Sequence, residues 1–333
     1  MTTMATIIAL LNLPGQVPAE TPEAQTRRLQ ESGSKSMALD AIDAWLQSPS
    51  AKKEWHMEPD AFATRLRALV EAPYKLAQSG YPWCTYASVL MCLLRRDPSG
   101  VVNYALKLYN TGKIGLGRIT GEVSSDLRDF DVARYLRREL SDKPPNNKTH
   151  YAQPVDFMLM AGLCSHEMNN FTGDFDGPID DFDAAPPIDD LTPTKNLMLA
   201  SGLYASVTPT KINPSDTDAA VQALIAPSSE QDILLVAPMS YFVDGLNFVP
   251  KFNKIGRHIV PVVRNDGTKL AFWSWGDQPI ASLGMTDDGS LAPPTLDGVT
   301  GGYSMGINIP ELKKTVTDSK ASRWVITATL KPA

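Results

Sequence analysis

The spacing of apolar residues changes near Pro227, and this change limits the possible folds more than any other feature of the chain. Upstream, apolar residues recur at helical spacing in five segments: 34–47, 59–71, 84–94, 98–109 and 154–168. Downstream, short segments rich in Val, Ile and Trp predict strands at 232–237, 257–263, 269–275 and 323–330. The sequence Asn265-Asp266-Gly267 predicts a hairpin turn between the middle two. We therefore expect an α+β fold, with helices ahead of an antiparallel sheet.

The composition is typical of a soluble globular protein. Hydrophobic residues make up 43% of the 333 residues and charged residues 20%. The net charge of -6 argues against nucleic acid as a partner, because phosphate binding requires a basic surface. No apolar run approaches the roughly 18 residues of a membrane span, and no Lys or Arg precedes the apolar segment 4–13. We expect a protein made in the cytoplasm without a classical signal peptide.

Cys84 is the candidate nucleophile. The segment Gln78–Cys84 (QSGYPWC) leads into an apolar helix, and Cys84 falls at the N-terminus of that helix. The partial positive charge at a helix N-terminus favours a thiolate, so we expect the pKa of Cys84 to be lowered. Cys92 and Cys164 lie within apolar runs and are predicted to be packing residues. Three cysteines cannot build a disulfide framework, which predicts a reducing compartment or delivery from one.

His258 is the candidate base. Of the four histidines, it is the one that begins a predicted strand of the C-terminal sheet. Cysteine acyl-transfer enzymes assemble a helix-start cysteine and a distant histidine in this way, because the fold brings the two together. His166 and Cys164 are two positions apart on a predicted helix and face different directions, so they cannot hold a metal jointly. We predict no metal site and no cofactor.

The acidic segment near 171–192 is predicted to be an irregular, solvated insertion. A calcium loop is the alternative, since Asp174-Phe175-Asp176 begins with alternating carboxylates. The segment then departs from that pattern, which requires a glycine at the sixth position and a glutamate at the twelfth. A surface excursion without bound metal is therefore the better prediction.

In their order, these residues resemble the papain-like cysteine peptidase superfamily, in the wide sense that includes the NlpC-type cell-wall peptidases. Gln78 lies six positions before Cys84, where this family has its oxyanion-hole glutamine. His258 begins His-Ile-Val, which resembles the family's His-Ala-Val strand. The resemblance implies a papain-like fold, with an N-terminal helical lobe (residues 1–70) packed on a catalytic domain (71–333) that carries the antiparallel sheet.

The third catalytic residue is less well defined. Ser274-Trp275-Gly276 resembles the end of the family's Asn-Ser-Trp-Gly, but Trp273 stands where the orienting asparagine is expected. Ser274, Asp277 or Gln278 could orient His258 instead. We prefer Asp277, because a carboxylate best holds an imidazolium. The candidate catalytic residues are therefore Cys84, His258, Gln78, Ser274 and Asp277.

The resemblance implies a cysteine hydrolase that cleaves an amide bond in a peptide, a protein or a cell-wall peptide. A deamidase and a transglutaminase are alternatives, since both share the thioester intermediate. A catalytically inactive papain-like binding module is a further alternative, and so is a structural component of a secretion or phage particle. By analogy with bacterial effector toxins, the chain would be sent out by a contact-dependent system. Its partners would then include a secretion apparatus or an immunity protein, besides the substrate.

Overall fold

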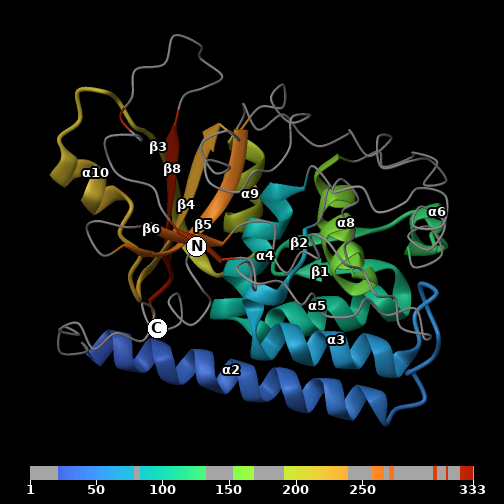
Figure 1. Cartoon of the computed structure of the whole chain (residues 1–333). Helices are drawn as coiled ribbons and strands as arrows, with labels where there is room; N and C mark the ends of the chain where they lie inside the picture. The colour runs from blue at the N-terminus through green and yellow to red at the C-terminus, as the bar shows by residue number, and fades with distance from the viewer. Residues whose placement is uncertain are drawn as a thin grey trace.

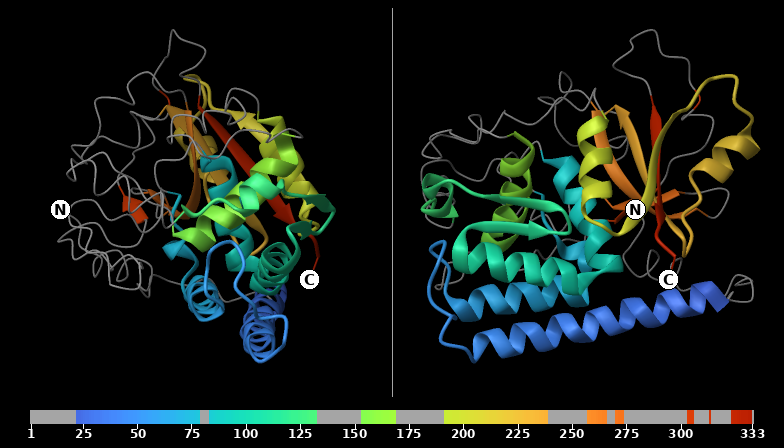
Figure 2. Two further views of the ribbon diagram at one scale, coloured as in Figure 1. Left: turned by 90° about the vertical axis from the view of Figure 1, so that its right-hand side faces the viewer. Right: turned by 180° about the vertical axis from the view of Figure 1, so that it is seen from behind.

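The structure is a computed structural model, and it describes residues 22–78, 83–132, 153–168, 191–238, 257–265, 270–273, 303–305, 313 and 323–332. Most of the helices come from the N-terminal half of the chain, and a six-stranded antiparallel sheet comes from the C-terminal half (Figure 1). The α+β class predicted from the sequence is therefore confirmed. The helices other than α10 pack together on one side of the sheet, and α2 runs along both the helical part and the sheet (Figure 2).

The predicted helices are present, with small changes at their ends except at the start of the first one. They are α2 (Pro22–Leu46), α3 (Pro59–Glu71), α4 (Cys84–Arg96), α5 (Pro98–Thr111) and α8 (Pro154–Met168). Shorter elements that the sequence analysis missed are η1 (Pro73–Lys75), α6 (Ser125–Arg128), α9 (Thr192–Ala200) and α10 (Asp218–Leu224). α2 begins well before the predicted Ser34, and in this first part the buried Arg27 donates a hydrogen bond to the carbonyl of Lys331. A hydrogen bond of this kind cannot be predicted from the spacing of apolar residues.

The sheet has the strand order β3-β8-β4-β5-β6-β7. Its strands are β3 (Tyr204–Lys211), β4 (Gln231–Pro238), β5 (Arg257–Asn265), β6 (Leu270–Trp273), β7 (Tyr303–Met305) and β8 (Trp324–Leu330). The predicted strands correspond to β4, β5, β6 and β8, and β5 pairs with β6 as expected. β3 was missed because it is polar and contains Pro209, which an edge strand tolerates.

A small hairpin outside this sheet joins α5 to α6. It consists of β1 (Lys113–Leu116) and β2 (Ile119–Glu122). Gly117 lies at its turn with a φ of 59°, and a Cβ there would come within 2.1 Å of the Ser201 carbonyl oxygen. Only glycine allows this turn to approach the end of α9 so closely.

The centre of the sheet is buried on both faces. Along β4, Leu234 and Val236 belong to the main hydrophobic cluster on the helical side. Ile233, Leu235 and Ala237 alternate with them and belong to a second cluster on the opposite face, which includes Val221 of α10. Because β4 is covered from both sides, it appears in the sequence as one continuous apolar run.

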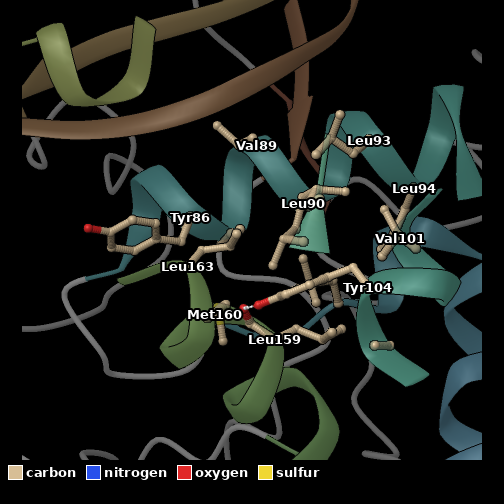
Figure 3. Packing of buried hydrophobic residues seen from close by; sticks show 14 of the residues in the cluster. Tyr86, Val89, Leu90, Leu93, Leu94, Val101, Tyr104, Leu159, Met160 and Leu163 are labelled. Carbon is tan, nitrogen blue, oxygen red and sulfur yellow. Dashed lines mark hydrogen bonds between the residues drawn. The ribbon is translucent and has the colours of Figure 1, made fainter. Parts of the chain in front are cut away.

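α4 is the central helix of the main cluster. Its residues from Cys84 to Leu94 are all buried, between β5 on one side and α5 and α8 on the other. Figure 3 shows Leu90 of α4 beside Tyr104 of α5. The Tyr104 hydroxyl donates a hydrogen bond of 2.8 Å to the Leu159 carbonyl of α8. α4 is therefore held firmly on several sides.

The N-terminal helices share this cluster. Trp45 of α2, Phe62 of α3 and Tyr109 of α5 form a group of contacting rings, with centroids 4.1 to 5.4 Å apart. The division into a lobe before residue 70 and a catalytic domain after it stays a prediction. None of the helices described in the structure is long and apolar enough to cross a membrane.

Candidate active site

Cys84 is the first residue of α4, as predicted. Its sulfur accepts hydrogen bonds from backbone groups of Cys84 and Thr85, at the helix start, and of Ile259 in β5. The N-terminal amides of α4 therefore point at the thiol, which is the local geometry that a helix-start cysteine requires.

α4 contacts the backbone of β5 one turn further along as well. Ser88, which is buried, donates a hydrogen bond of 2.9 Å from its hydroxyl to the Ile259 carbonyl. Cys84 and Ser88 are four positions apart, so they lie on the same face of α4. Both reach the backbone of Ile259, and His258 is the residue immediately before it. The fold therefore brings the backbones of the two candidate residues together from distant parts of the chain.

The side chain of His258 leaves the strand toward the second cluster. His258 is paired with Ala237 of β4, and paired residues of an antiparallel sheet project from the same face. Ala237 and Val260 belong to the second cluster, whereas Ile259 belongs to the main cluster with Cys84. The first bond of the His258 side chain therefore starts from the sheet face opposite to the one that carries Ile259.

Burial determines the protonation states of both groups. Burial raises the pKa of the Cys84 thiol to about 11, against the opposing effect of the three backbone hydrogen bonds. Burial also lowers the pKa of His258 to about 3. The prediction of a lowered pKa for Cys84 is therefore wrong for this structure. A helix N-terminus contributes roughly 0.3–1 kcal/mol, which is less than one pKa unit, and desolvation of a fully buried group exceeds it. At pH 7 the structure holds a neutral thiol and a neutral imidazole.

Gln78 is buried and lies three positions after η1. The backbone around it is bound by side chains from two helices. Asp156 of α8 accepts a hydrogen bond of 2.7 Å from the Ala77 amide, and Arg65 of α3 donates one of 2.7 Å to the Lys75 carbonyl. Neither Asp156 nor Arg65 was predicted from the sequence. The feature that could have indicated Asp156 is that it is a single acidic residue in the otherwise apolar first turn of α8.

Trp273 has a structural role. It is fully buried in the main cluster, and its indole Nε1 donates a hydrogen bond of 2.9 Å to the Tyr74 carbonyl in η1. It holds η1 against β6 and does not replace the asparagine of papain-like enzymes. The three predicted orienting residues, Ser274, Asp277 and Gln278, lie outside the described residues.

The remaining candidates have the packing or surface roles that were expected. Cys92 and Cys164 are fully buried, and burial raises the pKa of Cys92. The ring Nδ1 of His166 lies 3.0 Å from the Thr120 carbonyl oxygen, at an exposed position. Of the acidic insertion predicted near 171–192, residues 171–190 lie outside the described residues, and α9 begins at Thr192. Among the residues that are described, no group of His, Cys, Asp and Glu could hold a metal ion.

A cavity of about 390 Å³ lies away from Cys84, beside the β1–β2 hairpin. Its lining includes Glu54, Glu122, Arg128 and Asp129. The Arg128 guanidinium is already bound to Glu54 at 2.8 Å and to the Asn110 carbonyl at 3.2 Å. Because the guanidinium that lines the cavity is bound to Glu54, the cavity gives no sign of a particular ligand.

Comparison with known proteins adds no relative. No family model, no curated protein and no solved structure matches this chain. The site must therefore be judged from its own geometry.

The raised pKa of Cys84 predicts the pH dependence of its alkylation. Iodoacetamide should label Cys84 slowly at pH 7, and the rate should rise about tenfold per pH unit up to about pH 10, because only the thiolate reacts and the pKa is about 11. Peptide mass spectrometry would measure labelling, with circular dichroism at each pH to show that the protein is folded. Cys92 and Cys164 serve as internal controls that should stay unlabelled. A rate that is already maximal below pH 8 would show a thiolate instead.

Proposed function

We propose that this protein is a cysteine hydrolase that cleaves an amide bond in a peptide, a protein or a cell-wall peptide, with Cys84 as nucleophile and His258 as base. The observation that supports this most directly is the contact of the Cys84 sulfur with the backbone of Ile259. It joins a helix-start cysteine to the strand that carries the histidine, which is the arrangement the papain-like resemblance implies.

The proposed reaction requires the imidazole of His258 to turn around the edge of β5 toward the Cys84 sulfur, because its side chain starts from the opposite face of the sheet. The imidazole then takes the proton of the Cys84 thiol as the sulfur attacks the carbonyl carbon. The carbon–nitrogen bond then breaks, the imidazolium returns the proton to the leaving amine, and a thioester remains on Cys84. Water hydrolyses the thioester to a carboxylic acid and frees the thiol. Because both groups are neutral at pH 7, charge develops only as the proton moves.

The developing oxyanion requires hydrogen-bond donors. The backbone amide of Cys84, at the start of α4, is one candidate, and the side-chain amide of Gln78 is the other. Asp277, Ser274 or Gln278 remain the proposed partners that orient His258. In a deamidase the leaving group would be ammonia, and in a transglutaminase an amine would replace water at the last step.

A catalytically inactive binding module is the second candidate function. The burial of both side chains favours it, with Cys84 only 3% exposed and His258 1%. So does Trp273, which occupies the place of the orienting asparagine with a packing role.

Trapping of the acyl intermediate distinguishes these two functions. The protein would be mixed with 4-nitrophenyl acetate, quenched in acid and digested, and the acetyl group located by mass spectrometry. The hydrolase should release nitrophenolate in a burst and carry acetyl on Cys84. His258→Gln should slow this burst by roughly 10²–10⁴-fold, whereas the control Cys164→Ala should leave it unchanged. Acetyl groups confined to surface lysines, with no effect of His258→Gln, would favour the binding module.

A further inference from the structure

Asp156 is a buried carboxylate in the first turn of α8, and its side chain is 0% exposed. It forms a two-pronged ion pair with Arg65 of α3. Arg65 Nε lies 2.9 Å from Asp156 Oδ1, and Arg65 Nη2 lies 2.6 Å from Asp156 Oδ2. A fork of this kind fixes the relative orientation of both side chains, besides pairing their charges.

This ion pair also binds the backbone of residues 75–77, directly before Gln78. Asp156 Oδ2 accepts from the Ala77 amide at 2.7 Å, and Arg65 Nη2 donates to the Lys75 carbonyl at 2.7 Å. The Trp273 indole binds the Tyr74 carbonyl at 2.9 Å. Three backbone groups within four consecutive residues are thus bound by side chains from α3, α8 and β6.

Stability alone does not account for the charges of this pair. Burying two charges costs solvation free energy, and apolar residues of similar size often stabilise a protein equally well or better. Apolar side chains, however, could not satisfy the Ala77 amide and the Lys75 carbonyl, which are polar backbone groups in the interior. The pair therefore fixes the position of the backbone immediately before Gln78.

We propose that Asp156, with Arg65, is a positioning residue that holds the backbone before Gln78, so that the Gln78 amide can donate a hydrogen bond to the oxyanion of an amide substrate. This inference rests on the proposed function. It assigns to Asp156 an effect on the reaction that is transmitted through Gln78, without contact with substrate.

The test is a double-mutant cycle between Asp156→Asn and Gln78→Ala, with turnover of 4-nitrophenyl acetate as the assay. In Asp156→Asn one carboxylate oxygen becomes an NH₂ group that faces the donors of Arg65 or Ala77. Gln78→Ala should lower kcat about 10²-fold, as expected for one oxyanion donor. Asp156→Asn should lower kcat by about tenfold to a hundredfold, as expected for a misplaced group, and KM should change little. In the Gln78→Ala background, Asp156→Asn should have almost no further effect on kcat.

Asp232→Asn is the matched control, because it disrupts a second buried Arg–Asp pair among the described residues, at the far end of α4. It should reduce stability but leave kcat unchanged at a temperature where the variant is folded. If Asp156→Asn proves too unstable, Arg65→Lys offers a milder change, since lysine keeps the charge but cannot form the fork. The inference is overturned if the effects of Asp156→Asn and Gln78→Ala multiply, or if kcat is insensitive to both Asp156→Asn and Arg65→Lys.

Amide hydrogen exchange provides a readout that does not depend on catalysis. The Ala77 amide should lose protection in Asp156→Asn and keep it in Asp232→Asn. If turnover proves independent of Cys84, the proposed function fails, yet this exchange result still shows whether Asp156 holds the segment. If turnover requires Cys84 but Ala77 stays protected in Asp156→Asn, the positioning inference alone fails.

Discussion

Replacing Cys84 with alanine should remove hydrolase activity while leaving the fold intact. Without the sulfur no thioester forms, so kcat should fall on the order of 10³-fold or more. The change removes one small buried side chain and its hydrogen bonds with the backbone of Ile259, which should cost about 1 kcal/mol of stability. Turnover of 4-nitrophenyl acetate and of labelled casein would measure activity, and thermal unfolding would measure stability.

Cys164→Ala is the control for this experiment. Cys164 is also fully buried in a helix of the main cluster, in α8, but lies outside the proposed site. The same chemical change there should leave activity unaltered. If the protein is a toxin, growth inhibition on expression should disappear with Cys84→Ala and persist with Cys164→Ala. Full activity of Cys84→Ala would remove Cys84 from the mechanism.

Replacing Asp232 with asparagine should lower the free energy of unfolding more than Cys84→Ala or a change at a surface ion pair. Asp232 of β4 is buried and binds Arg96 of α4, with Arg96 Nη2 at 3.0 Å from Asp232 Oδ1. Arg96 Nη1 also binds Glu31 of α2 at 2.7 Å, and the Tyr204 hydroxyl of β3 donates to Asp232 Oδ2 at 2.8 Å. Burial alone would lower the pKa of Arg96, but Asp232 and Glu31 together raise it above its ordinary value. The network therefore connects α2, α4, β3 and β4.

Asp232→Asn leaves the buried Arg96 charge without its main partner. Removing one partner of a buried ion pair lowers the free energy of unfolding by about 3–5 kcal/mol. Urea unfolding would measure this loss. The matched control is Asp43→Asn at the ion pair of Asp43 with Arg67, where both side chains are partly or largely exposed. A surface pair contributes less than about 1 kcal/mol. Equal losses in the two variants would show that the buried network is not a main source of stability.

Much of the fold could be predicted because its signals are local. α3 and α8 begin at prolines, and their apolar spacing runs to the last turn. β4 and β8 are short apolar runs, and the C-terminal hairpin has a recognisable turn. β3 escaped prediction because its place at the edge of the sheet allows a polar strand that contains proline.

The candidate site was predictable to a lesser degree. The position of Cys84 at a helix start followed from the sequence, but its protonation state did not. Its pKa depends on how many atoms of other elements exclude water from the thiol. The part played by Asp156 was hidden for the same reason, since its partners Arg65 and Ala77 lie far away in the sequence.

By itself, the sequence determined where most helices and strands lie, because side-chain periodicity and turn residues act over a few neighbouring positions. Only the tertiary structure decided the strand order, the docking of α4 against the backbone of Ile259, and the burial that keeps Cys84 and His258 neutral. These properties arise from contacts between segments that are distant in the sequence, such as α4 and the strand that carries Ile259. Desolvation and buried ion pairing are sums over such contacts, and no local pattern in the chain records them.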